Sequence, residues 1–97
     1  MNTDRQPSPD VISAIEGIIR TIGRISPTDA RFTTSVELFD SGYIESLGIV
    51  QLTAELEETF GVTFSEQDLF DPRFSTVIGI AYVVHDRRAA LSNPPSG

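Results

Sequence analysis

Apolar residues recur at helical spacing near the start of the chain. A hydrophobic residue returns every three or four positions, which places these side chains on one face of a helix. They are Val11, Ile15, Ile18 and Ile22. Ser8 followed by Pro9 is typical of a helix start, because the hydroxyl can cap the first N–H groups and proline suits the first turn. We therefore predict a first helix that ends near Gly23.

Residues 24–45 predict a loop that is long for a compact domain. Loops of this length are usually functional or carry side chains that pack into the core. This one contains five apolar residues that are candidates for such anchors. They are Ile25, Phe32, Val36, Leu38 and Phe39.

A second helix is predicted from about Ser46 to Phe60, with Gly61 as a left-handed cap. Its periodicity defines two faces. The face expected to enter the core holds Ile49, Leu52, Leu56 and Phe60. The other face holds Leu47, Val50, Gln51, Ala54 and Glu58, and it leaves apolar side chains in solvent unless a partner covers them.

The last third of the chain predicts a short helix over about residues 66–70 and a longer one over 76–91. Ser65 and Asp68 resemble a capping box, and Ser75 is a candidate cap for the last helix. The buried stripe of that helix is expected to be Val77, Ile80, Ala81 and Val84. We predict an all-α four-helix bundle with a long first loop and a short third helix. One domain spans residues 10–91, between disordered ends at residues 1–9 and 92–97.

The composition narrows the classes of partner. The 97 residues include no cysteine and no lysine, and the net charge is −7. Residues 32–72 hold nine acids and no base. The excess of acidic residues argues against nucleic-acid binding, which needs clustered positive charge. It serves either solubility or the docking of a basic partner. No apolar run is long enough to span a membrane and no secretory signal is evident, so we expect a cytoplasmic protein.

Ser46 is the candidate reactive residue. It stands where a helix begins with unpaired N–H groups and a partial positive charge, a setting that favours an attached anion. A serine that merely caps the helix is the plain structural alternative. The sole histidine, His85, makes a Ser–His hydrolase conceivable, but we expect no catalytic residue, because no adjacent base or orienting acid is evident. We also expect no metal site, because an EF-hand alignment around Gly42 lacks its last glutamate.

The stretch from Leu38 to Leu52, followed by Glu55-Leu56-Glu57-Glu58 and Phe60-Gly61-Val62, resembles the acyl carrier protein family. The similarity covers about residues 10–90, including the long first loop and the short third helix. Within that family the chain looks most similar to stand-alone carriers of the D-alanyl or aminoacyl type, which share Phe-Asp-Ser-Gly before the serine and Val-Gln-Leu after it.

The resemblance implies that Ser46 accepts a covalent 4′-phosphopantetheine arm from coenzyme A, transferred by a separate phosphopantetheinyl transferase. It also implies that partner enzymes dock on Glu45, Leu47, Val50, Gln51, Ala54 and Glu58. Glu45 replaces the usual aspartate of the motif. Gly48 and Gln51 stand where fatty-acid carriers often have acids, which weakens the case for a fatty-acid synthase role.

We accordingly expect a non-enzymatic carrier that holds an acyl or aminoacyl thioester. Its partners would be an acyl- or aminoacyl-activating ligase and a downstream acyltransferase or condensing enzyme, and we expect a monomer. The alternative is an acidic helical protein-interaction module without a prosthetic group.

Overall fold

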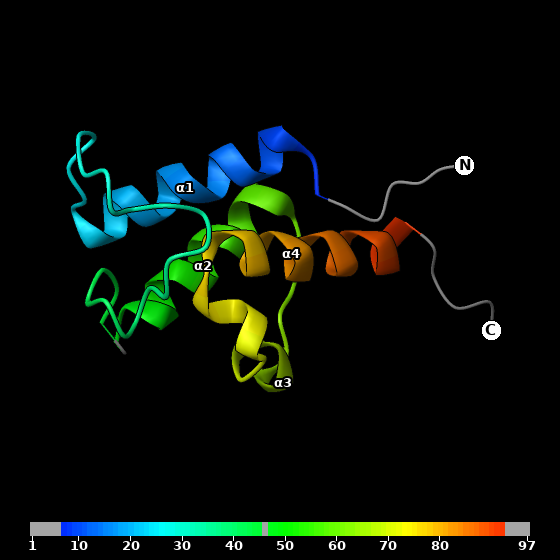
Figure 1. Ribbon diagram of the computed structural model, residues 1–97. Coiled ribbons are helices and arrows are strands. Elements are labelled where there is room, and N and C mark those ends of the chain that lie inside the picture. The colour runs from blue at the N-terminus through cyan, green and yellow to red at the C-terminus, as the bar shows by residue number, and fades with distance from the viewer. Residues whose placement is uncertain (1–6, 46, 93–97) are drawn as a thin grey trace.

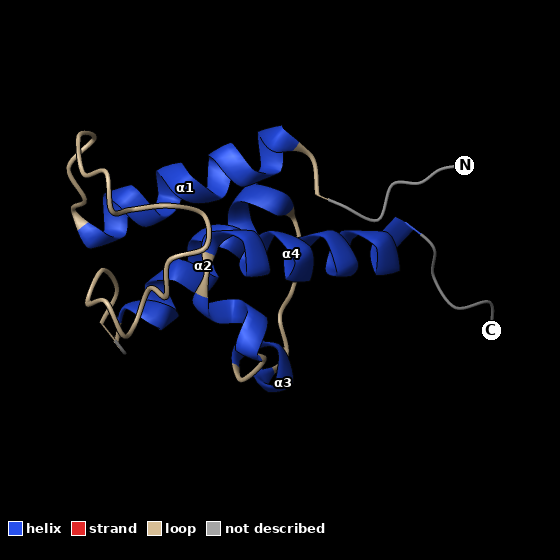
Figure 2. Ribbon diagram, in the orientation of Figure 1, coloured by secondary structure: helices blue, strands red, loops and turns tan. Residues whose placement is uncertain are grey.

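A computed structural model describes residues 7–45 and 47–92, with side chains up to residue 90. Ser46 and most of the two predicted disordered ends lie outside the described residues. The elements are α1 (Pro9–Gly23), α2 (Gly48–Phe60), α3 (Glu66–Leu69), the 3-10 helix η1 (Pro72–Ser75) and α4 (Val77–Ser92). The described residues form helices and loops without a strand (Figure 2). The all-α prediction with a short third helix is confirmed, whereas η1 was not predicted.

The core lies where three helices meet. α1 packs against both α2 and α4, and η1 packs against α4, while α3 lies at the lower edge of the view (Figure 1). The predicted stripe of α4 is confirmed, since Val77, Ile80, Ala81 and Val84 are all fully buried. In α2, Leu52 and Leu56 are fully buried, and Ile49 and Phe60 pack partly buried against them. Helical periodicity therefore identified the inward faces.

Both ends of α1 follow from local chemistry. The Ser8 hydroxyl accepts a hydrogen bond from the Val11 N–H, and Pro9 occupies the first turn, as predicted. The helix ends at Gly23, but the left-handed residue is Arg24, with φ of 53°. A side chain at Gly23 would overlap the backbone carbonyl oxygen of Tyr43. Glycine at this position therefore lets the end of the first loop lie directly against the end of α1.

The second helix begins later than predicted. α2 starts at Gly48 with Leu47 as its N-cap residue, rather than at Ser46. The Gly48 N–H donates to the Glu45 carbonyl over 2.7 Å, so a turn precedes the helix. At the other end Gly61 adopts the expected left-handed conformation, with φ of 67°.

The predicted capping box of α3 is present. The Ser65 hydroxyl accepts from the Asp68 N–H, and the Asp68 carboxylate accepts from the Ser65 N–H. The prediction that Ser75 caps α4 is wrong. Its hydroxyl donates to the Pro72 carbonyl, and the hydroxyl of Thr76 instead accepts from the Gly79 N–H.

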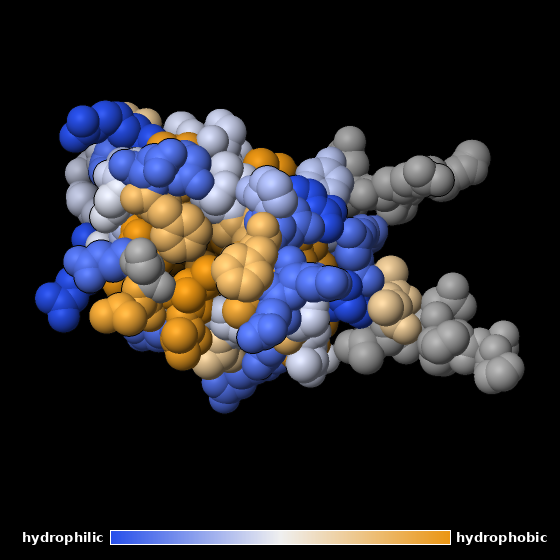
Figure 3. All heavy atoms as spheres, turned by 90° about the horizontal axis from the view of Figure 1, so that it is seen from below, coloured by the Kyte–Doolittle hydropathy of each residue, from blue (hydrophilic) through white to orange (hydrophobic). Residues whose placement is uncertain are grey.

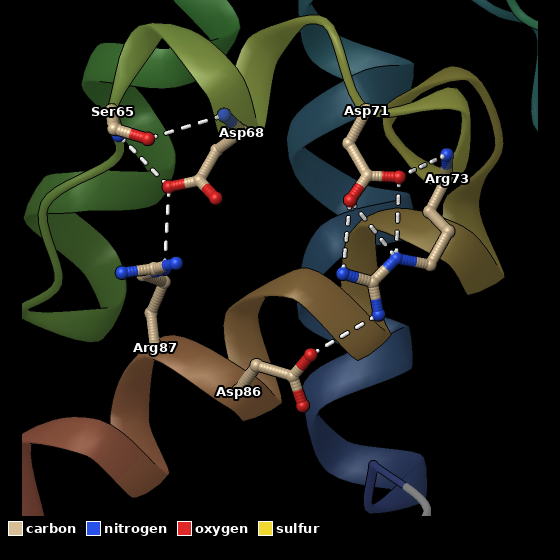
Figure 4. A network of polar contacts seen from close by, with 6 residues as sticks. All are labelled: Ser65, Asp68, Asp71, Arg73, Asp86 and Arg87. Atoms are coloured by element: carbon tan, nitrogen blue, oxygen red, sulfur yellow. Dashed lines mark hydrogen bonds and ion pairs between the residues drawn. The ribbon is translucent and has the colours of Figure 1, made fainter.

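Ion pairs tie α3 and η1 to α4 (Figure 4). The Arg73 guanidinium lies 3.0 Å from the Asp71 carboxylate and 3.1 Å from that of Asp86. The Arg87 Nε lies 3.2 Å from the buried carboxylate of Asp68. The carboxylates of Asp68 and Asp71 thus serve the fold.

The first loop is anchored along its whole length. Ile25, Phe32 and Leu38 are buried as predicted, and Val36 and Phe39 are partly buried. Backbone hydrogen bonds also join the loop to other elements. The Leu38 N–H donates to the Ser75 carbonyl over 2.8 Å, and the Ile78 N–H donates to the Thr34 carbonyl over 2.9 Å. The loop is therefore part of the scaffold and fixes where its last residues lie.

Candidate functional site

The end of the first loop carries the chain from the core to the surface within a few residues. Gly42 turns the backbone with φ of 84°, and Ile44 is almost fully buried. Leu47, three residues later, exposes 85% of its surface, and Glu45 is also exposed. Ser46 itself lies outside the described residues, but its neighbours on both sides lie at the surface.

Two carboxylates hold the loop in this shape. Glu37 accepts hydrogen bonds from the N–H groups of Asp40 and Phe39, and these bonds, chiefly that of Asp40, lower its pKa. Asp29 accepts a 2.8 Å hydrogen bond from the Tyr43 hydroxyl, which lowers the pKa of Asp29, while burial raises the pKa of Tyr43. Tyr43 also packs edge-on against Phe32. These contacts stabilise the turn that leads to residue 46.

The start of α2 suits an anion. Its N-cap residue, Leu47, makes no side-chain capping hydrogen bond, and its first turn contains no acidic residue. The N–H dipoles of the first turn therefore carry their partial positive charge without a competing carboxylate in the helix. A phosphodiester attached at position 46, two residues before the helix begins, fits this environment.

A polar surface depression of about 430 Å³ lies beside the same point in the chain. Residues on both sides of position 46 line it, together with the end of α1. Its lining includes Arg24, Gly42, Glu45, Leu47 and Gly48. The Arg24 guanidinium in this lining can pair with a phosphate, so the residues present fit phosphopantetheine.

The outward face of α2 is exposed as predicted. Leu47 and Val50 expose 85% and 70% of their surface, although both are large apolar residues. Gln51, Ala54 and Glu58 are exposed as well. With Glu45 these residues form a surface that we call the docking face. Figure 3 shows hydrophobic side chains gathered on the side of the molecule that α2 and α3 present downwards in Figure 1.

Phe70 is an exposed aromatic residue that the sequence did not single out. It follows α3 directly and exposes 84% of its surface, while its neighbour Leu69 packs partly buried against the core. Hydrophobicity alone predicts both to be buried, and no local signal distinguishes them. Phe70 adds a third large exposed apolar residue to Leu47 and Val50.

Other candidate chemistry has a structural explanation or lacks support. The Glu57 carboxylate accepts the Phe64 N–H over 2.9 Å, so it closes the turn after α2. His85, the histidine of the conceivable Ser–His pair, is half-buried on α4. Among the described residues, no cluster of three or more His, Cys, Asp or Glu side chains is arranged to hold a metal ion.

The comparison with protein families decides the nature of the site. A family model described as the phosphopantetheine attachment site matches residues 13–81, more than half of the chain. The chain belongs to the phosphopantetheine-binding carrier protein family. This carrier protein therefore bears a covalent 4′-phosphopantetheine arm, and the alternative of a module without a prosthetic group is not favoured.

Relatives support the same family. The D-alanyl carrier proteins of Streptococcus pyogenes serotypes M5 (strain Manfredo), M49 (strain NZ131) and M1 are each 30% identical to this carrier protein over 79 residues. The alignment covers 81% of this chain and 100% of each relative. No solved structure gives a significant match. In residues 7–45 and 47–92, every helix is too short or too polar to traverse a lipid bilayer.

Proposed function

We propose that Ser46 is the residue that carries the phosphopantetheine arm, and that the arm holds an aminoacyl or other acyl group as a thioester. The observation that carries this proposal is the position of Ser46 inside the matched attachment-site region, between exposed residues and just before the start of α2. Ser41 lies in the same region, but it stands before the turn at Gly42 and its hydroxyl donates to the Leu38 carbonyl. Ser46 is therefore the better candidate.

The protein's own residues present the hydroxyl rather than activate it. A serine needs a base to become a nucleophile, and in this proposal the transferase supplies that base. The chain contributes the turn at Gly42, the buried anchor Ile44 and the positive end of α2. When bound, the arm supplies a thiol on a long flexible chain, which this cysteine-free protein otherwise lacks.

We favour an aminoacyl cargo over a fatty acyl cargo. The relatives that align over their full length are D-alanyl carrier proteins. Gly48 and Gln51 are uncharged in this chain, so the start of α2 lacks the acids that fatty-acid carriers often have there. An adenylate-forming ligase for a small amino acid is then the expected source of the cargo, and an acyltransferase or condensing enzyme its destination.

The docking face is the proposed contact surface for these enzymes. Leu47 and Val50 offer apolar area that no described part of the chain covers, and Glu45 and Glu58 offer negative charge beside it. Exposed apolar residues beside charge are typical of a transient interface, in which charge speeds encounter and apolar contact gives affinity. The expected monomeric state and cytoplasmic address stay predictions.

Loading by a transferase tests the proposal. Apo protein incubated with coenzyme A and a broad-range phosphopantetheinyl transferase should gain the mass of one phosphopantetheine. Ser46→Ala should gain nothing, and the control Ser41→Ala should load normally. Unmodified wild-type protein, or loading that persists in Ser46→Ala, would overturn it.

A further inference from the structure

Two adjoining depressions form one groove between α1 and α2. The first, of about 430 Å³, lies beside the residues that flank position 46. The second, of about 330 Å³, continues along the helices between Ala14, Gly17 and Glu55. Ile22 and Gln51 line both depressions and join them. We call this continuous surface the α1–α2 groove.

The near end of the groove carries a positive charge. Arg24 lines it, held by its left-handed backbone at the end of α1, and the side chain is exposed. Arg24 makes no ion pair with another residue in the part of the chain that the structure describes. By contrast, Arg20 lies over the Phe32 ring and donates to the Ser26 carbonyl. Arg24 is thus the basic side chain that is available to an anion in the groove.

The far end of the groove is lined by Gly17. A side chain at Gly17 would meet no atom within 4 Å, so no described residue covers the groove at this position. Ile18 and Ile22 supply apolar lining, and the Gln51 amide and Glu55 carboxylate supply polar groups on the α2 side. This mixture suits a chain that alternates methylene and amide groups, because the carboxylate accepts N–H donors.

We propose that the phosphopantetheine arm rests in the α1–α2 groove when no partner enzyme is bound, with its phosphodiester at Arg24 and its thiol end toward Glu55. This inference rests on the proposed attachment at Ser46. The lengths agree: the seven steps along α2 from Gly48 to Glu55 rise by roughly 10 Å. The arm beyond the phosphate is about as long as four extended residues, roughly 14 Å.

Tethering makes weak contacts sufficient. An arm fixed beside the groove has an effective concentration in the millimolar range, so no tight site is needed to hold it. A weak hold also lets partner enzymes withdraw the arm. Leu47 and Gln51 belong both to the docking face and to the lining of the groove, so a docked partner would contact the edge of the resting site.

Amide spectra of apo and holo protein test the resting site. Glycine amides serve as reporters, because Gly17, Gly23 and Gly48 lie along the groove from its far end to its near end. Loading should shift Gly17 and Gly23 as well as Gly48, and the geminal methyl groups of the arm should show nuclear Overhauser effects to the Ile22 methyl groups.

Arg24→Gln should reduce the amide shifts caused by loading and the nuclear Overhauser effects to Ile22. The control Arg88→Gln, which removes the same charge from α4, should leave both unchanged. An exposed ion pair corresponds to a factor of about two to five in the bound population. Shifts confined to residues 45–49, or equal spectra in Arg24→Gln and wild type, would overturn the resting site. The mass of the arm on Ser46, measured on the same samples, shows separately whether the proposed function stands; without loading both proposals fail.

Discussion

Leu38 provides the sharpest test of the view that the first loop is scaffold. Its side chain is fully buried although it lies outside every helix, and its backbone bonds both to Ser75 and to Ile44. Leu38→Ala removes three buried carbon atoms, a loss of about 2.4 kcal/mol at about 0.8 kcal/mol for each. The cavity left in a packed core raises the total to about 3–4 kcal/mol.

A loss of this size is easy to measure. Small domains are stable by only about 5–15 kcal/mol, and 3 kcal/mol lowers the melting temperature by at least about 12 °C for a domain of this length. Urea unfolding of Leu38→Ala should give the loss at an unchanged m-value. The control Leu47→Ala, at a residue with 85% exposure, should stay within about 0.5 kcal/mol of wild type.

The reasoning fails if Leu38→Ala costs less than about 1 kcal/mol, because that is the range of an ordinary surface loop residue. It also fails if both leucine variants lose the same stability. In either case the loop would be a covering segment, and the position of the residues around Ser46 would need another explanation.

Four further variants give three more predictions, each on a separate part of the structure. Gly79→Ala should destabilise the fold by about 1–3 kcal/mol, because the added Cβ would overlap the backbone of η1. Gly17→Ala should stabilise it by up to about 1 kcal/mol, because Gly17 faces open space within a helix. Equal melting temperatures for the two variants would contradict this prediction. Tyr43→Phe removes the hydrogen bond that lowers the pKa of Asp29. A lowered carboxyl pKa stabilises the fold above the pKa of the unfolded state, and this contribution is lost as pH falls below about 4. As pH falls from about 5 to about 3, the free energy of unfolding should therefore decrease less in Tyr43→Phe than in wild type. The same decrease in both proteins would count against this hydrogen bond. Val50→Asp should raise the KM of the transferase for apo protein about ten-fold at unchanged stability, and an unaltered kcat/KM would remove Val50 from the docking face.

Local patterns in the sequence predicted the helices well, because their determinants lie within a few residues of each other. The inward stripe of α4 and the capping box at Ser65 and Asp68 follow from spacing alone. The left-handed Gly61 follows from the conformational freedom of glycine at a helix end. These elements need no knowledge of the rest of the fold.

Features that depend on tertiary packing were not predictable in the same way. Ile44 is buried and Phe70 exposed, although each is a large apolar residue beside a helix. Thr76 rather than Ser75 caps α4, because η1 uses the Ser75 hydroxyl for its own carbonyl. When two neighbouring residues have similar side chains, the packing of distant segments decides which one is buried or caps a helix.

The groove illustrates the same limit for the site. Arg24 and Gly17 are separated along α1 and have no motif in common, and only the packing of α1 against α2 brings them to one surface. The exposure of Val50, Gln51, Ala54 and Glu58 was predictable because they lie on one face of one helix. The candidate attachment residue came from its sequence motif, since Ser46 lies outside the described residues.

Locating the arm by fragmentation mass spectrometry tests the central claim most directly. Trypsin leaves residues 32–73 as one peptide, because no arginine or lysine occurs between Phe32 and Pro72. This peptide contains Ser35, Ser41 and Ser65 as internal alternatives to Ser46. After loading, the account predicts fragment ions that place the phosphopantetheine on Ser46 alone; an arm on any of the other three serines, or on none, would contradict it.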